Sequence, residues 1–268
     1  MKKVIAILVF VFATGVVFGA ATDCAAEGDK YYKKRNDSKD RAAAIKTIDK
    51  AIENYRKAVD KKPSYSLYYK LALATEFKFH YLLEGENTHQ LKWDAYKSLV
   101  DEMEKYCEEN GKCADSAQMQ YALAIVWGRF GELMNPMEAA SSGLAGKMKG
   151  YAERIIEIDP SFKDYAAYAS LGRLHFKAPN IIFILTWPDK KKSKEYLEVY
   201  FEKNPDSLLA KHFLADTLWD VDEKERSKKL FLEVINSKPG KEYFNDLRVI
   251  NDCKEAAKEK GIIEEEKE

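Results

Sequence analysis

Apolar residues recur along most of the chain at intervals of three and four, with charged residues between them. Ala51, Tyr55 and Ala58, for example, would lie on one face of a helix. The segment 241–261 near the C-terminus carries another such stripe. Only 13 Gly and 7 Pro interrupt these runs, and both residue types disfavour helix interiors. The pattern predicts an all-α protein with few turns and disfavours an all-β fold.

Four prolines divide this helical pattern into repeated units. Pro63, Pro160, Pro205 and Pro239 each follow a strongly helical run, which is where a helix-terminating proline is expected. We therefore expect about five helical hairpins followed by a C-terminal capping helix. The hairpins span residues 24–61, 65–110, 114–158, 164–204 and 206–237, the capping helix spans 241–261, and residues 262–268 form a frayed tail.

The spacing within these units is that of the tetratricopeptide repeat (TPR), in which two helices pack closely at a small residue. Gly172 and Ala215 occupy equivalent close-contact positions, each after a leucine. Gly128 marks a more degenerate copy, whose second helix we expect to run without a break over 137–158. These observations predict one TPR-like α-solenoid over residues 22–261.

One unit is longer than the others. Ala215 and Pro239 are 24 residues apart, as in a TPR, whereas Gly172 and Pro205 are 33 apart, so we infer an insertion of nine residues. The insertion falls within residues 178–188 and is strongly apolar. An exposed apolar loop usually contacts a partner or ligand, although the loop could instead fold back over its own hairpin. We favour the first interpretation and assign four loop residues to binding: Ile182, Phe183, Leu185 and Trp187.

The N-terminus has the composition of a secretion signal. Lys2 and Lys3 precede an apolar run that starts at Val4, and the small residues Gly19-Ala20-Ala21 follow it. The run of about 18 residues is short for a membrane span, which needs ~20. We therefore expect residues 1–21 to be a cleaved signal peptide and the rest of the chain to be exported to the periplasm or cell envelope.

Export would permit disulfides, and four cysteines follow the predicted signal peptide: Cys24, Cys107, Cys113 and Cys253. A turn-forming spacer separates Cys107 from Cys113, so we predict a local disulfide there, the alternative being two free thiols. Cys24 could be lipidated, disulfide-bonded or free. Asp23 precedes it, at a position where a lipoprotein signal normally has a small residue. We therefore favour a chain that carries no lipid anchor. Contact with the membrane is expected only if Cys24 is lipidated.

Several segments of the second half occur together in one known family. They are Ile158-Asp-Pro160-Ser-Phe162, Leu171-Gly172 through Ala178-Pro179, the inserted loop, Asp189-Lys-Lys-Lys and Leu214-Ala215-Asp. In this combination they resemble the T-component of TPR-associated tripartite periplasmic (TRAP) transporters. The similarity covers roughly residues 115–260, about half of the chain. The chain departs from the family at two places. Pro188 stands where the family usually has Gly before the loop aspartate, and the lipid-attachment signal around Cys24 is poor.

This resemblance implies a periplasmic accessory protein rather than an enzyme. Members of the family pair with the substrate-binding protein of the transporter and are described as trimer-forming lipoproteins. For this chain the resemblance implies a periplasmic substrate-binding protein as partner, a homotrimer, and assistance in the uptake of a small, apolar carboxylate. The alternative function is a general TPR scaffold of the cell envelope, which assembles another protein complex and binds no small molecule.

Other kinds of chemistry find little support in the sequence. Lys and Arg number 44, as do Asp and Glu, so no excess charge favours nucleic acid. Gly143-Leu-Ala-Gly146-Lys147 lacks the spacing of a phosphate-binding loop, and we expect it to be helical. The four histidines do not have metal-ligand spacing, and no carboxylate is singled out as catalytic. We therefore expect no cofactor, no metal site and no enzymatic activity.

A second candidate binding surface lies on the first helices of three units. In the TPR arrangement these helices line the groove in which partners bind. A groove with arginines and aromatic rings could hold a peptide or an apolar carboxylate, although the aromatic residues could equally belong to the core. The residues that we assign to this groove are Arg129, Arg173, Phe176, His212, Asp216 and Trp219.

Overall fold

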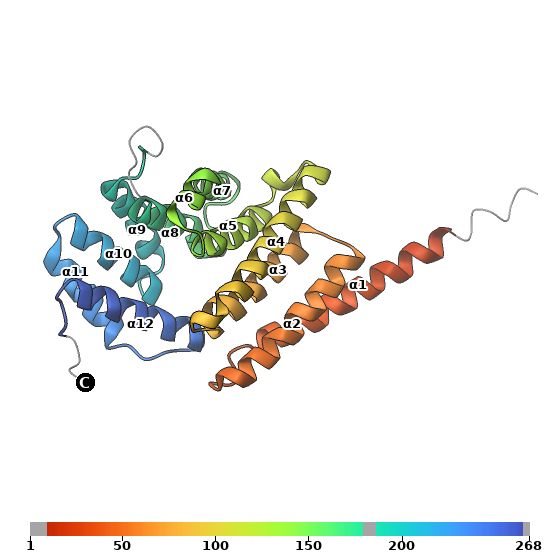
Figure 1. Ribbon diagram of the computed structural model, residues 1–268, viewed down its shortest axis with the longest axis horizontal. Coiled ribbons are helices and arrows are strands. Elements are labelled where there is room, and N and C mark those ends of the chain that lie inside the picture. Colours follow the sequence, from red (N-terminus) through yellow and green to blue (C-terminus); the bar gives the residue numbers. More distant parts are fainter. Residues whose placement is uncertain (1–9, 179–185, 265–268) are drawn as a thin grey trace, which may run out of the picture. The chain divides into compact units, whose positions relative to one another are not determined.

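The computed structural model describes residues 10–178 and 186–264, with side chains from residue 22 onward apart from that of Glu86 (Figure 1). Within these ranges every regular element is helical, which confirms the all-α prediction. The chain divides into two compact units, Met1–Leu133 and Met134–Glu268, which are described separately below.

In its described part, residues 10–133, the first unit consists of five α-helices and three short helical elements. The α-helices are α1 (Phe10–Lys33), α2 (Arg41–Lys61), α3 (Tyr65–Glu76), α4 (His89–Asn110) and α5 (Ala117–Gly131). The short elements are a π-helix, Phe77–Leu82, and two 3₁₀ turns, Glu86–Thr88 and Cys113–Asp115. Polar side chains begin three of the helices: Asp40 accepts from the backbone N–H of Ala43, Ser64 from that of Leu67, and Ser116 from that of Met119.

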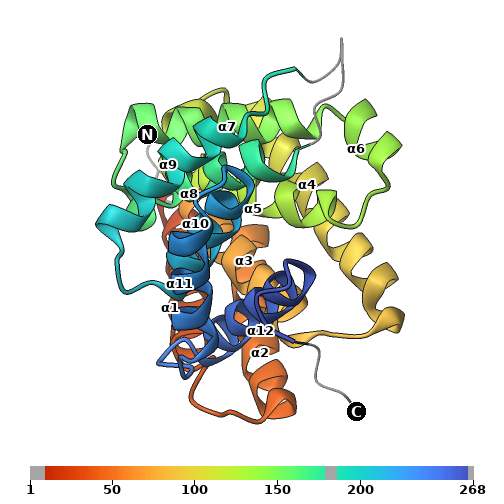
Figure 2. The same cartoon turned by 90° about the vertical axis from the view of Figure 1, so that its left-hand side faces the viewer.

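Small residues bring the first two helices of this unit together. α1 runs beside α2, as both views show (Figures 1 and 2). Tyr55 of α2 is almost fully buried, and a Cβ atom at Gly28 of α1 would overlap its ring. α3 packs against α5, and α4 also contacts α5. The stripe through Ala51, Tyr55 and Ala58 that the sequence indicates is therefore a packing face, because all three residues are buried.

Seven α-helices make up the second unit over residues 134–178 and 186–264. They are α6 (Pro136–Ser141), α7 (Leu144–Ile158), α8 (Phe162–Lys177), α9 (Lys190–Lys203), α10 (Leu208–Asp220), α11 (Lys224–Ile235) and α12 (Tyr243–Glu259). α8 pairs with α9 and α10 pairs with α11, while α12 packs on both α10 and α11. A Cβ atom at Gly172 of α8 would overlap Leu197 of α9, so the close contact inferred from the sequence is present. Ile250 and Cys253 of α12 join the same buried cluster as Leu214 and Phe231.

One feature of the backbone contradicts the sequence-based prediction, and another was not predicted. The prediction of one continuous helix over 137–158 is wrong, because Gly143 adopts a left-handed conformation (φ 68°) and separates α6 from α7. At the start of α8, Lys163, Asp164 and Tyr165 are all left-handed, with φ of 51°, 55° and 65°. The side-chain amide of Asn204 donates to the carbonyl of Asp164 at 2.9 Å and helps to hold this turn.

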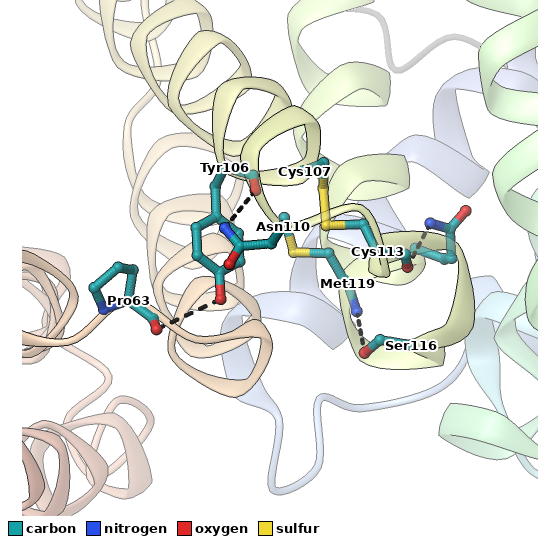
Figure 3. Close-up of a disulfide and its surroundings, with 8 residues drawn as sticks. Pro63, Tyr106, Cys107, Asn110, Cys113, Ser116 and Met119 are labelled. Atoms are coloured by element: carbon teal, nitrogen blue, oxygen red, sulfur yellow. Dashed lines mark hydrogen bonds between the residues drawn. A yellow bond between two sulfur atoms is a disulfide. The ribbon is translucent and has the colours of Figure 1, made fainter.

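The predicted disulfide between Cys107 and Cys113 is present at the junction of α4 and α5 (Figure 3). Gly111, left-handed at φ 66°, ends α4 and turns the chain back, which brings the two Cα atoms to 5.3 Å. The side chain of Gln120 donates to the carbonyl of Cys113 at 3.0 Å, fixing the start of α5. Cys24 and Cys253 are free thiols, and Cys253 is buried.

Candidate functional site

Four charged or polar side chains of the second unit meet where α8, α10 and the end of α12 approach one another. They are Arg173 of α8, His212 and Asp216 of α10, and Lys260 directly after α12. His212 and Asp216 are one helical turn apart and therefore lie on the same face of α10. We call these four residues the Arg173 cluster.

Asp216 holds the cluster together. Its side chain is buried, with 3% of the residue exposed. Arg173 Nη1 donates to Oδ2 at 2.8 Å, and Lys260 Nζ lies 2.9 Å from Oδ1. Burial alone would raise the pKa of Asp216, but the ion pairs with Arg173 and Lys260 lower it below its usual value. The carboxylate is therefore charged at neutral pH and has a cation at each oxygen.

The guanidinium of Arg173 is fixed by aromatic rings as well as by Asp216. Its Cζ atom lies 4.8 Å from the ring centroid of Phe176 and 4.3 Å from that of Phe213. Within the described residues the only hydrogen bond that this side chain donates is the one to Asp216. The side chain keeps 18% of its surface exposed. A guanidinium has five N–H donors, so most of those of Arg173 have no protein acceptor there.

His212 is the least satisfied polar residue of the cluster. Only 5% of it is exposed, and its Nδ1 atom has no hydrogen-bond partner among the described residues. Its ring packs against those of Phe213 and Phe231. Burial, followed by the positive charge of Arg173, lowers the pKa of His212 to about 4. The imidazole is therefore neutral at physiological pH.

The two aromatic residues assigned to the groove pack against cations. Phe176 is buried, and Lys190 Nζ lies 3.7 Å from its ring centroid while pairing with Asp220 at 2.9 Å. Trp219 is half-buried, with Lys224 Nζ 4.0 Å from its ring centroid. Both rings thus serve as packing surfaces for lysine side chains, and Phe176 also supports Arg173.

Arg129, the remaining residue of the predicted groove, lies in the first unit. Its Nε and Nη2 atoms both donate to Glu76 Oε1, at 3.0 and 2.7 Å, and Nη1 donates to Glu132 Oε1 at 2.8 Å. Although burial favours the neutral form, the carboxylates of Glu132 and Glu76 raise the pKa of Arg129 further above its usual value. Every nitrogen of this guanidinium is engaged by protein acceptors.

Of the four loop residues assigned to binding, the structure describes one. Trp187 contacts its own hairpin, since its ring lies edge-on to His175 of α8 with 5.0 Å between the ring centroids. It also lies near the preceding helix, where Lys149 Nζ of α7 is 5.8 Å from its ring centroid. The backbone N–H of Asp189 donates to His175 Nδ1 at 3.2 Å and anchors the end of the loop. The other three residues lie outside the described part of the chain: Ile182, Phe183 and Leu185.

Two residues of the site were missed from the sequence. Phe213 completes the aromatic support of Arg173, and Lys260 supplies the second cation to Asp216. Phe213 follows His212 directly, so the helical register of α10 could have suggested it. Lys260 lies at the end of the predicted capping helix, and nothing in the sequence pointed to its pairing with Asp216, because that pairing depends on where α12 packs.

Metal sites and membrane-spanning helices are absent from the described residues. No group of three or more His, Cys, Asp or Glu side chains could hold a metal ion there. Among the helices of that part of the chain, none combines the length and the apolar character needed to cross a membrane.

Comparison with known proteins identifies the fold. No protein-family model matches the chain, and no curated protein sequence matches it significantly. Among solved structures, it is similar to the crystal structure of a thermophilic TPR protein from Thermus thermophilus. The TM-score is 0.56 at 12% sequence identity, and the alignment covers 88% of this chain and 98% of the Thermus chain. The TPR-like, all-helical repeat fold expected from the sequence is thereby confirmed.

Proposed function

We propose that this chain is an exported, non-catalytic TPR-like accessory protein that binds the substrate-binding protein of a TRAP-type transporter and assists uptake of a small, apolar carboxylate. The TPR-like fold supports a protein partner, because repeats of this kind present extended surfaces for binding. The transporter and the homotrimer that we also propose rest on the resemblance of residues 115–260 to the T-component family.

The observation that carries this proposal is the Arg173 cluster. Arg173 of α8 binds Asp216 of α10 and packs against Phe176, and its charge acts on His212, one helical turn from Asp216. They combine a partly exposed guanidinium with aromatic rings, which suits recognition of an anionic group attached to an apolar body. The donors of Arg173 that Asp216 does not engage are free to bind such a group.

Export is part of the proposal and is supported by two features of the chain. Residues 1–21 have the charge and apolar pattern of a signal peptide. The Cys107–Cys113 disulfide is of the kind that persists in oxidising compartments. Intact mass spectrometry of the protein from its native envelope should find a chain that begins near Thr22, and a chain that retains Met1 would contradict export.

The direct test is a binding titration between residues 22–268 and TRAP-type substrate-binding proteins of the same genome. We expect saturable binding to one of them, with the stoichiometry measured in parallel by light scattering. Lys238→Gln, an exposed residue of the second unit, serves as a surface control that should bind normally. No binding to any of these proteins, together with capture of a different envelope complex, would favour the general TPR scaffold instead.

A further inference from the structure

We propose that Arg173 is the receptor for the carboxylate of an apolar monocarboxylate ligand, with Lys260 and His212 completing the site. This inference deepens the proposed function and rests on it for the transport role of the ligand. It assigns the recognised group, the chemical class of the ligand and the side chains that bind it.

The first argument is that the guanidinium of Arg173 is already held in a fixed orientation. The rings of Phe176 and Phe213 both pack against it, at 4.8 and 4.3 Å from Cζ. Asp216 fixes its orientation through one hydrogen bond from Nη1. A side chain that is already held in place loses little conformational entropy when a ligand binds. Its remaining donors form a planar fork that matches the two oxygens of a carboxylate.

The second argument is the unpartnered nitrogen of His212. A buried polar atom without a hydrogen bond is costly, and such atoms are uncommon in folded proteins. Nδ1 of His212 is in this state among the described residues, and His212 lies one helical turn from Asp216, the carboxylate that binds Arg173 and Lys260. A ligand oxygen that reached this region could accept a hydrogen bond from an Nδ1–H group. The same oxygen would be attracted by the neighbouring cations.

The third argument is the charge of the cluster, which selects the class of ligand. The cluster carries two positive charges, on the partly exposed Arg173 and Lys260, and one negative charge, on the buried Asp216. The single net positive charge matches a monoanion better than a dianionic phosphate. Phe213, whose ring packs against Arg173, supplies apolar surface beside it. The ligand class that fits is a carboxylate on an apolar body.

The test uses 3-phenylpropanoate, its neutral amide 3-phenylpropanamide and inorganic phosphate as probes in calorimetric titrations of the full mature chain. We expect the carboxylate to bind and the amide to bind at least about tenfold more weakly, because it offers no charge to the guanidinium. We expect phosphate to bind more weakly than the carboxylate. Absence of carboxylate binding, or equal binding of the amide, would overturn the proposal, and preferential phosphate binding would overturn the ligand class.

Two variants assign the site. Arg173→Lys keeps a positive charge beside Asp216 but removes the fork, so carboxylate affinity should fall about tenfold while the fold is kept. Lys177→Gln changes an exposed side chain near His212 and should weaken binding less. The matched control is Arg248→Lys on α12, where the arginine is paired with Asp252. If Arg173→Lys binds the probe as well as the wild type and the control do, Arg173 is not the receptor.

Failure of this inference can be told apart from failure of the proposed function. If the chain binds a TRAP-type substrate-binding protein but none of the carboxylate probes, the assigned ligand site is wrong and the partner stands. If the probes bind through Arg173 and no substrate-binding protein does, the ligand site stands and the transporter role is wrong.

Discussion

Arg129 in the first unit and Arg173 in the second are partnered differently. In the first unit all three nitrogens of Arg129 donate to Glu76 or Glu132. In the second unit Arg173 donates a single hydrogen bond within the described residues, to Asp216, and Phe176 and Phe213 pack against it. The sequence assigned both to one binding groove. Protein acceptors therefore engage every nitrogen of Arg129 but only one of Arg173 within the described residues, and this difference is why we propose a binding role for Arg173 alone.

The largest expected effect follows from this difference. Arg129→Met leaves the largely buried carboxylate of Glu76 without its partner, so the free energy of unfolding should fall by about 3 kcal/mol or more. Arg173→Met leaves Asp216 still paired with Lys260, and the loss should be smaller, about 1–2 kcal/mol. Urea denaturation of the two variants beside the wild type measures both values. Equal losses would remove the distinction between the two arginines.

His212 should give the second unit a pH dependence that its replacement removes. Its pKa of about 4 in the folded chain lies below the value near 6.5 expected when unfolded. The unfolded chain therefore binds more protons between these values, and stability is lost as the pH falls from 6.5 towards 4, by up to about 3 kcal/mol. Asp216, whose folded pKa is also lowered, adds a further loss only at more acidic pH.

The measurement is the free energy of unfolding of wild type and His212→Gln at several pH values between 7.5 and 4.5. The variant should be less sensitive to pH over this range, because it lacks the group that must gain a proton. Parallel curves for the two proteins would show that His212 is not buried in its neutral form.

The disulfide should stabilise the first unit selectively. It closes a short loop, for which the chain-entropy model gives about 2 kcal/mol. Reduction should therefore increase hydrogen exchange of the backbone amides in α4 and α5 and leave those of α10 and α11 nearly unchanged. Cys107→Ser/Cys113→Ser is the matched variant and should reproduce the effect without reductant. Equal changes in both units would mean that the bridge acts on the whole chain.

A close helix contact in each unit can be tested by adding a single methyl group. Gly172→Ala and Gly28→Ala add a methyl group that overlaps Leu197 and Tyr55 respectively, so each should lose about 1–3 kcal/mol despite the higher helix propensity of alanine. Gly146→Ala on α7 is the control, because a Cβ atom there meets nothing within 4 Å. It should stabilise the protein by up to about 1 kcal/mol. Thermal unfolding of the three variants checks these signs.

The sequence predicted those parts of the molecule that depend on local contacts. Repeat proteins pack mainly neighbouring helices, so the spacing of Gly172 and Ala215 was sufficient to place two hairpins. The same holds for Cys107 and Cys113, which a turn brings together. The left-handed turn at Lys163–Tyr165 had no signal, because none of its residues is a glycine.

The candidate site was predictable only in part, for a related reason. Helical register placed Arg173, Phe176, His212 and Asp216 on suitable faces of their helices. It could not show whether an arginine would be saturated by carboxylates, since that depends on the positions of Glu76 and Glu132 around Arg129. Nor could it identify Lys260, which reaches Asp216 from a different helix.

The central claim is that Arg173, and not Arg129, offers its donors to a carboxylate. The most direct measurement is a ¹H–¹⁵N NMR titration of the arginine side chains with 3-phenylpropanoate, with Arg173→Lys and Arg129→Lys used to assign the two Nε–H signals. The Nε–H signal of Arg173 should shift progressively to saturation while that of Arg129 stays in place. A titration that moves Arg129 and leaves Arg173 unchanged, or that moves neither, would contradict the account.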